Sequence, residues 1–207
     1  PHQLPAIGYG KILKDILYKV HIRSVHGSTG IEVNDLQIDS RNVKPGSCFI
    51  AIKGVAVDGH EFISKAIELG ATAIVCEHLP EHLNDDVAFI QVANSAEAAG
   101  FMANQFFGNV SMQMRVVGVT GTNGKTTIAT LLYKLFSSFG YRCGLVSTVD
   151  YHIADKVVPS THTTPDVISL NGLLKQMYDA GCTYVFMECS SHAIHQHRIT
   201  GIHFAGA

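Results

Sequence analysis

The stretch Arg115–Leu132, RVVGVTGTNGKTTIATLL, constrains the fold of this chain more than any other. Its apolar run Val116–Val119 predicts a buried strand, the Gly-Thr-Asn-Gly segment predicts a tight turn, and Lys125 is expected to begin a helix. A strand, a glycine-rich turn and a helix in this order are typical of loops that bind phosphate at a helix N-terminus. The stretch therefore predicts a nucleotide-phosphate site in an α/β fold.

The residue types in this loop fit the chemistry of a triphosphate. Gly121 and Gly124 allow backbone N–H groups to close around phosphate oxygens, because a β-carbon would block the approach or forbid a positive φ. Lys125 supplies a positive charge for the β- and γ-phosphates, and Thr126 offers a hydroxyl to Mg²⁺. The match to the P-loop pattern is imperfect, since Val119 stands at its first glycine position. The alternative is a glycine turn with a solvated lysine. The residues predicted to bind the nucleotide phosphates are Gly121, Thr122, Asn123, Gly124, Lys125, Thr126 and Thr127.

A second candidate site residue follows a later strand. The apolar run Tyr184–Met187 predicts a strand that ends in Glu188. Ligands of open α/β sheets bind at the carboxyl ends of the strands, so we expect Glu188 close to the phosphate loop. There it would act as a second Mg²⁺ ligand beside Thr126 or as a base that positions water. The alternative is an ordinary exposed carboxylate at a strand end.

Strands and helices alternate along the chain, which predicts two α/β domains. We expect a small N-terminal α/β domain over residues 1–110. Residues 111–207 would form the first half of a phosphate-loop domain with a mainly parallel sheet, and Gly108–Met114 would join the two. The predicted strands are Val33–Ile38, Ser47–Ile52, Ala73–Cys76, Val87–Val92, Val116–Val119, Cys143–Thr148 and Tyr184–Met187, with a hairpin-like segment up to Val158. The predicted helices are Lys11–Val20, Glu61–Leu69, Ser95–Phe107, Thr126–Phe139 and Asp166–Ala180, the last capped by Thr164 or Asp166. Ile202–Ala207 resembles the start of another strand, so we expect a fragment of a larger protein.

The composition narrows the functional classes. A formal net charge of −2 with 15% charged residues does not favour a nucleic-acid or membrane partner. The chain lacks both the layout of a signal peptide and an apolar run near the ~20 residues that span a bilayer, so we expect a cytoplasmic protein. The five scattered cysteines are expected to be buried and reduced. A metal site at His192, His195 and His197 is a weaker alternative, because their spacing is not typical of zinc.

Five segments together resemble the Mur ligase family. They are GTNGKTT (Gly121–Thr127), THTTPD (Thr161–Asp166), MECSSHAIHQHR (Met187–Arg198), DSRNVKPGSCFIAIKG (Asp39–Gly54) and DGHEFISKAIELGA (Asp58–Ala71). GTNGKTT marks the wider family, which includes folylpolyglutamate synthetases. The other segments narrow the resemblance to members that add the third peptide residue to UDP-N-acetylmuramoyl-L-alanyl-D-glutamate.

The resemblance implies three domains, of which this sequence resembles the first and the earlier half of the second. The first holds a uridine nucleotide, the second is an ATPase, and the third binds the incoming amino acid. Val55–Val57 fall at variable contact positions, and His162 stands where relatives often carry Asn. The implied substrate-binding residues are Ile38 and Ser40 for the uridine nucleotide, and Thr163, Thr164, Ser190, Gln196 and Arg198 for the muramoyl peptide.

The resemblance also implies an ATP- and Mg²⁺-dependent amide ligase of peptidoglycan precursor synthesis. Its partners would be the UDP-N-acetylmuramoyl dipeptide and a diamino acid, either meso-diaminopimelate or L-lysine, and we expect a monomer. Lys125 and Glu188 would be catalytic, with Mg²⁺ held by Thr126 and Glu188. The alternatives are another ligase of the family and a truncated module that binds nucleotides without ligation. A switch GTPase is not favoured, because the sequence has no Asn-Lys-x-Asp segment.

Overall fold

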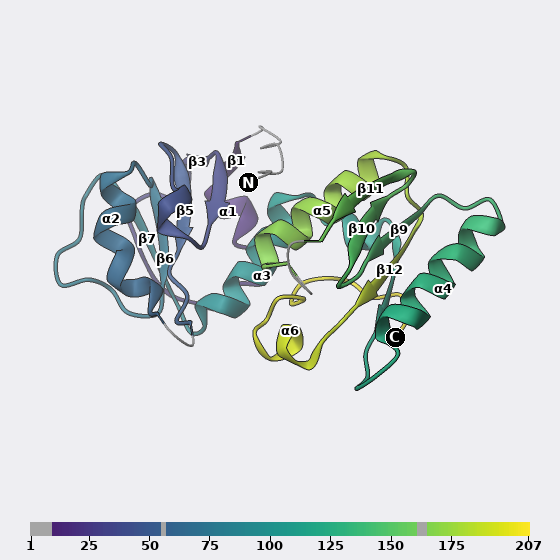
Figure 1. The fold of residues 1–207 in the computed structure, drawn as a ribbon. Helices are drawn as coiled ribbons and strands as arrows, with labels where there is room; N and C mark the ends of the chain where they lie inside the picture. Colours follow the sequence, from purple (N-terminus) through teal and green to yellow (C-terminus); the bar gives the residue numbers. More distant parts are fainter. Residues whose placement is uncertain (1–9, 55–56, 161–164) are drawn as a thin grey trace. The chain divides into compact units, whose positions relative to one another are not determined.

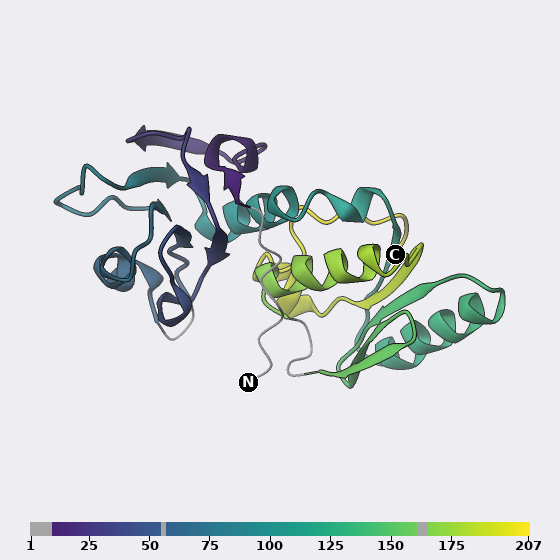
Figure 2. The same cartoon turned by 90° about the horizontal axis from the view of Figure 1, so that it is seen from above.

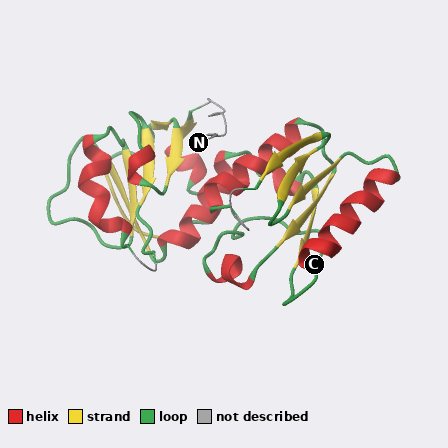
Figure 3. Cartoon of the chain, viewed as in Figure 1, coloured by secondary structure: helices red, strands yellow, loops and turns green. Residues whose placement is uncertain are grey.

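The structure is a computed structural model, and it describes residues 10–54, 57–160 and 165–207. The chain divides into two compact units, Pro1–Phe106 and Phe107–Ala207 (Figure 1). Each unit contains a five-stranded sheet with helices beside it (Figure 3). The α/β class predicted from the sequence is therefore confirmed.

The first unit has the strand order β2-β7-β6-β5-β4, in which β4 to β7 run parallel and β2 pairs antiparallel with β7. The short strands β1 and β3 form a separate antiparallel pair. Phe49, Ile74 and Phe89 fill the core against α2. The strands are β1 (Lys11–Ile12), β2 (Ile22–His26), β3 (Glu32–Val33), β4 (Asp35–Gln37), β5 (Ser47–Ile50), β6 (Ala73–Cys76) and β7 (Ala88–Val92). The helices are α1 (Leu13–Ile16), α2 (Ile63–Glu68) and α3 (Ser95–Phe106), with 3₁₀ turns η1 (Ser40–Asn42) and η2 (Gly59–Phe62).

Tertiary hydrogen bonds changed the predicted elements near the start of this unit. The helix expected over Lys11–Val20 is a single turn, because β1 pairs with β3 and the N–H of Leu13 donates to the carbonyl of Ile31. The strand expected over Val33–Ile38 is broken at Asn34, whose N–H donates to Gly46 instead. Strand β2 was missed, since a polar edge strand shows little apolar alternation.

The second unit has the strand order β11-β10-β9-β12-β8, in which β9, β12 and β8 are parallel. Leu145 and Phe186 pack with Ala129 of α4, whereas Val146 and Val185 pack with Leu170 of α5. The two helices therefore cover opposite faces of the sheet (Figure 2). The strands are β8 (Arg115–Val119), β9 (Cys143–Val146), β10 (Asp150–Ile153), β11 (Lys156–Pro159) and β12 (Tyr184–Glu188). The helices are α4 (Lys125–Ser138), α5 (Val167–Asp179) and α6 (Ser191–His195), with the 3₁₀ turn η3 (Val110–Met112).

The helix cap of α5 and the cysteines of the second unit agree with the sequence predictions, whereas α6 and residues 202–207 differ from them. Asp166 caps α5, because its Oδ1 accepts hydrogen bonds from Ile168 and Ser169; Thr164 lies outside the described residues. Helix α6 was not predicted. Residues 202–207 do not form the expected strand, although Ala205 donates to the carbonyl of Val116 alongside β8. All five cysteines are free and buried, as predicted.

Candidate functional site

The glycine-rich loop connects β8 to α4 and depends on two glycines with positive φ. Gly121 has a φ of 145°, and Gly124, the N-cap residue just before α4, has a φ of 81°. A β-carbon at Gly124 would meet no atom within 4 Å, so the glycine is required by backbone conformation rather than by packing. The same geometry leaves open space at the start of the helix.

Helix α4 begins without a side-chain cap, which leaves its first N–H groups to other partners. Its N-cap residue, Gly124, has no side chain that could accept a hydrogen bond from these groups. The first four N–H groups of any helix lack an intrahelical partner, and an anion satisfies them well. Four other elements use side-chain oxygens for the same purpose: η1, η2, α5 and α6 are capped by Asp39, Asp58, Asp166 and Ser190, whereas α1, α2 and η3 have no side-chain cap either.

The ammonium group of Lys125 lies over the loop. Its Nζ donates to the carbonyl of Gly121 at 2.7 Å and to that of Thr122 at 3.4 Å. A positive charge therefore sits beside the glycine-rich backbone and the positive end of the α4 dipole. This combination attracts a polyanion.

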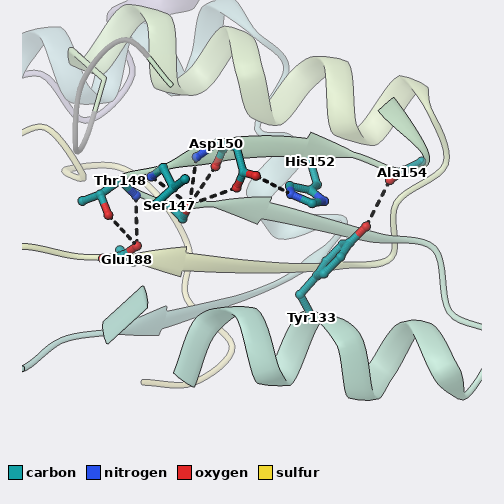
Figure 4. A network of polar contacts seen from close by, with 8 residues as sticks. Tyr133, Ser147, Thr148, Asp150, His152, Ala154 and Glu188 are labelled. Carbon is teal, nitrogen blue, oxygen red and sulfur yellow. Dashed lines mark hydrogen bonds and ion pairs between the residues drawn. The ribbon is translucent and has the colours of Figure 1, made fainter. Parts of the chain in front are cut away.

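Glu188 and Thr126 are brought together by Thr148, a residue that the sequence prediction did not single out. The Oε1 atom of Glu188 accepts a hydrogen bond from the N–H of Thr148 at 3.0 Å and from its hydroxyl at 3.4 Å (Figure 4). The hydroxyl oxygens of Thr148 and Thr126 lie 3.3 Å apart. Only 1% of Glu188 is exposed, so it is not an ordinary surface carboxylate. A threonine two residues after β9, the strand beside β12, was the available signal.

The turn between β9 and β10 holds Thr148 in this position. The buried hydroxyl of Ser147 accepts hydrogen bonds from the N–H groups of Val149 and Asp150 at 3.2 and 3.1 Å. It donates to the carbonyl of Asp150 at 2.9 Å, and the carboxylate of Asp150 lies 3.1 Å from Nε2 of His152 (Figure 4). These contacts fix the backbone on both sides of Thr148.

The residues expected to bind the uridine nucleotide lie after β4 in the first unit. Ile38 is half-buried, and Ser40 is buried as the first residue of η1. Of the three further contact positions, Val55 and Ala56 lie outside the described residues, and Val57 is exposed.

The residues expected to bind the muramoyl peptide surround α6 in the second unit. The hydroxyl of Ser190 caps α6 by accepting the N–H of Ala193 at 3.1 Å. Gln196 follows the helix and is exposed, and Arg198 is half-buried in the next turn. His162, Thr163 and Thr164 lie outside the described residues. All of these substrate roles stay predictions.

The donor atoms at the phosphate loop suit Mg²⁺ bound together with a nucleotide. Mg²⁺ prefers oxygen ligands and takes one or two from the protein, with the others from phosphates and water. The hydroxyl of Thr126 and the carboxylate of Glu188 meet that requirement. The histidine alternative gains no support, because the described residues contain no group of three or more His, Cys, Asp or Glu that could hold a metal. Within the same residues, no helix is both long and apolar enough to cross a bilayer.

Comparisons with known proteins match both units to one protein family. The family description "Mur ligase family, catalytic domain" matches residues 32–107, and "Mur ligase middle domain" matches residues 119–207. The UDP-N-acetylmuramoyl-L-alanyl-D-glutamate--2,6-diaminopimelate ligase of Cytophaga hutchinsonii is 56% identical over 195 residues, which cover 94% of this chain and 40% of that protein. The ligase of the same name from Bacteroides fragilis is 54% identical over 194 residues, with the same coverage.

Solved structures show the same fold. A structure of a UDP-N-acetylmuramoyl-L-alanyl-D-glutamate--2,6-diaminopimelate ligase superposes with a TM-score of 0.73 at 26% identity, covering 93% of this chain and 38% of that one. MurF ligase of Thermotoga maritima in complex with ADP gives a TM-score of 0.51 at 27% identity, covering 76% of this chain and 32% of that one. The chain spans about 40% of the length of the curated relatives it matches. Two domain descriptions of one family match most of these residues, and relatives more than half identical carry one name, so the chain belongs to the Mur ligase family.

Proposed function

We propose that this chain supplies the nucleotide-binding parts of a ligase that adds a diamino acid to UDP-N-acetylmuramoyl-L-alanyl-D-glutamate. The observation that carries the proposal is the uncapped start of α4, where Lys125 lies over the glycine-rich loop and Thr126 is linked through Thr148 to Glu188. The names of the relatives supply the substrate. They also favour diaminopimelate over L-lysine as the amino acid.

ATP and Mg²⁺ are proposed to bind at the phosphate loop. Backbone N–H groups of Gly121–Thr127 would surround the phosphates, and Lys125 would neutralise part of their charge. Thr126 and Glu188 would hold Mg²⁺. When bound, the ion would offset negative charge that builds up on the phosphoryl group during its transfer.

The proposed reaction uses ATP to turn a carboxylate into a group that an amine can attack. An oxygen of the D-glutamyl γ-carboxylate attacks the γ-phosphorus, the bond to ADP breaks, and an acyl phosphate forms. The amine of the diamino acid then attacks the acyl carbon, inorganic phosphate leaves, and the amine loses a proton. The protein contributes mainly positioning and charge neutralisation at the loop.

The substrate sites are proposed on both units. Ile38 and Ser40 would contact the uridine nucleotide. Ser190, Gln196 and Arg198, with Thr163 and Thr164, would hold the muramoyl peptide. The guanidinium of Arg198 is suited to a carboxylate or phosphate, because its planar N–H groups bind two oxygens at once.

A cytoplasmic monomer is part of the same proposal. All five cysteines are free thiols, which is typical of proteins kept in a reducing compartment. Size-exclusion chromatography with light scattering tests the monomer: a mass near 22.4 kDa supports it, and twice that mass would contradict it.

Calorimetry and a turnover assay test the function and separate it from the alternatives. Titration with MgATP and with the UDP-muramoyl dipeptide should each show saturable binding to one site. Release of ADP is then measured with dipeptide and diaminopimelate present. Binding without turnover favours a nucleotide-binding module for this chain, and binding of neither compound would overturn the proposal.

A further inference from the structure

We propose that Thr148 is a positioning residue that holds the two predicted Mg²⁺ ligands, Thr126 and Glu188, in place for the nucleotide. This inference rests on the proposed function, because it requires MgATP to bind at the phosphate loop. Thr148 lies between the helix that follows the loop and the strand that carries Glu188.

The direction of the hydrogen bonds follows from the number of protons available. A carboxylate only accepts, so the Thr148 hydroxyl donates its single proton to Oε1 of Glu188. The Thr126 hydroxyl, 3.3 Å away, must then donate to the oxygen of Thr148. As a donor, Thr126 keeps its oxygen lone pairs for a cation. The chain of hydrogen bonds thus orients Thr126 as a metal ligand.

The same contacts fix the carboxylate. Both hydrogen bonds from Thr148 reach Oε1 of Glu188, so Thr148 does not engage the other carboxylate oxygen. Thr148 itself is fixed by its backbone, because the Ser147 hydroxyl binds the N–H groups of the two residues that follow it. Positioned ligands lose little freedom when they bind a metal, and outer contacts of this kind commonly tune metal affinity.

Two substitutions separate the hydroxyl from the backbone contact. Thr148→Val removes the hydroxyl but keeps the branched shape and the N–H that bonds Glu188 at 3.0 Å. Thr148→Ser keeps the hydroxyl. A matched control is Thr183→Val. Thr183 lies just before β12, and its hydroxyl also makes a 3.4 Å hydrogen bond, to the carbonyl of Arg142.

The readout is the gain in ADP affinity that Mg²⁺ provides, measured by calorimetry with and without the ion. Loss of the hydroxyl's hydrogen bond to the charged Glu188 should reduce that gain about tenfold in Thr148→Val. ADP affinity without Mg²⁺ should stay unchanged, and Thr148→Ser and Thr183→Val should keep the wild-type gain. Thermal unfolding of each variant is recorded in parallel.

Each other outcome has a defined meaning. A wild-type gain in Thr148→Val would overturn the inference while leaving the proposed function intact. Equal losses of metal-free and Mg²⁺-dependent affinity would overturn it as well, since they indicate general damage to the site. If the unsubstituted chain shows no ADP binding at all, the proposed function itself fails.

Discussion

The hydroxyl oxygen of Thr126 lies 3.3 Å from that of Thr148, 22 residues further along the chain. The contact joins the first turn of α4 to the turn that follows β9, and Thr148 extends it to Glu188 on β12. Three segments thus meet where the carboxyl ends of parallel strands face the start of a helix. That is the position at which open α/β sheets bind phosphate ligands.

Lys125→Ala should weaken MgATP binding about 10- to 100-fold, because it removes a charge-assisted contact to the phosphates. The free energy of unfolding should change by less than about 0.5 kcal/mol, since within the described residues the Nζ atom bonds only to carbonyls of two exposed loop residues. Calorimetry and urea unfolding measure the two effects. Lys134→Ala, which removes an exposed lysine of the same helix, is the control and should bind normally. Normal binding by Lys125→Ala would remove the lysine from the site.

Gly124→Ala should lower the free energy of unfolding by about 1–2 kcal/mol through the cost of a positive φ. Gly140→Ala should cost about the same, because Gly140 has a φ of 88° and no atom within 4 Å of its β-carbon position. Only Gly124→Ala should also weaken MgATP binding. Urea unfolding followed by circular dichroism suits this chain, which contains no tryptophan. Equal loss of binding in both variants would show that helix stability, not the loop, controls affinity.

Asp58 should make the first unit sensitive to acid. Hydrogen bonds from the backbone N–H and the ring of His60 lower the pKa of its carboxyl group. A lowered folded-state pKa stabilises the protein above the ordinary value of about 4, and this stability is lost as the pH falls through the folded-state pKa.

Asp58→Asn should therefore be less stable than the wild type at neutral pH and should lose less stability on acidification below about pH 4. Urea unfolding across this pH range measures the difference. Asp85→Asn, at an exposed position, is the control and should follow the wild type. Parallel pH curves for the Asp58 variant and the wild type would contradict the assignment.

The cysteines should be unreactive in the folded chain. Burial raises the pKa of the Cys48 thiol to about 12 and that of the Cys189 thiol, next to Glu188, to about 11. Because the thiolate is the reactive form, iodoacetamide at neutral pH should leave both unmodified until urea unfolds the protein. Mass spectrometry of digested samples gives the extent of labelling at each cysteine. Rapid labelling of Cys189 in the folded state would show that the segment after β12 opens.

The strong sequence signals predicted most of the fold. Ala73–Cys76 was predicted with its observed bounds, because a short apolar run between turn residues has few alternatives. The helix after the loop was predicted within one residue at each end. Long-range pairing could not be predicted: Lys11–Ile12 became a strand only because Glu32–Val33 lies beside it.

The same contrast between local patterns and long-range pairing applies to the candidate site. Lys125, Thr126 and Glu188 stand in recognisable local patterns, so their positions followed from the sequence. Thr148 does not, because its importance comes from the order β9-β12-β8, which places its strand beside that of Glu188. Ser190 was predicted as a substrate-binding residue, but its role as the cap of α6 was not, because α6 is too short to be expected from the sequence.

The most direct test of the central claim is a titration of isotope-labelled protein with MgATP, followed by NMR of the backbone amides. If the loop surrounds the triphosphate, the amide signals of Gly121–Thr127 should shift together and saturate, and Lys125→Ala should need about 10- to 100-fold more MgATP to reach the same shifts. Amide signals of the loop that stay unchanged at saturating MgATP would contradict the claim.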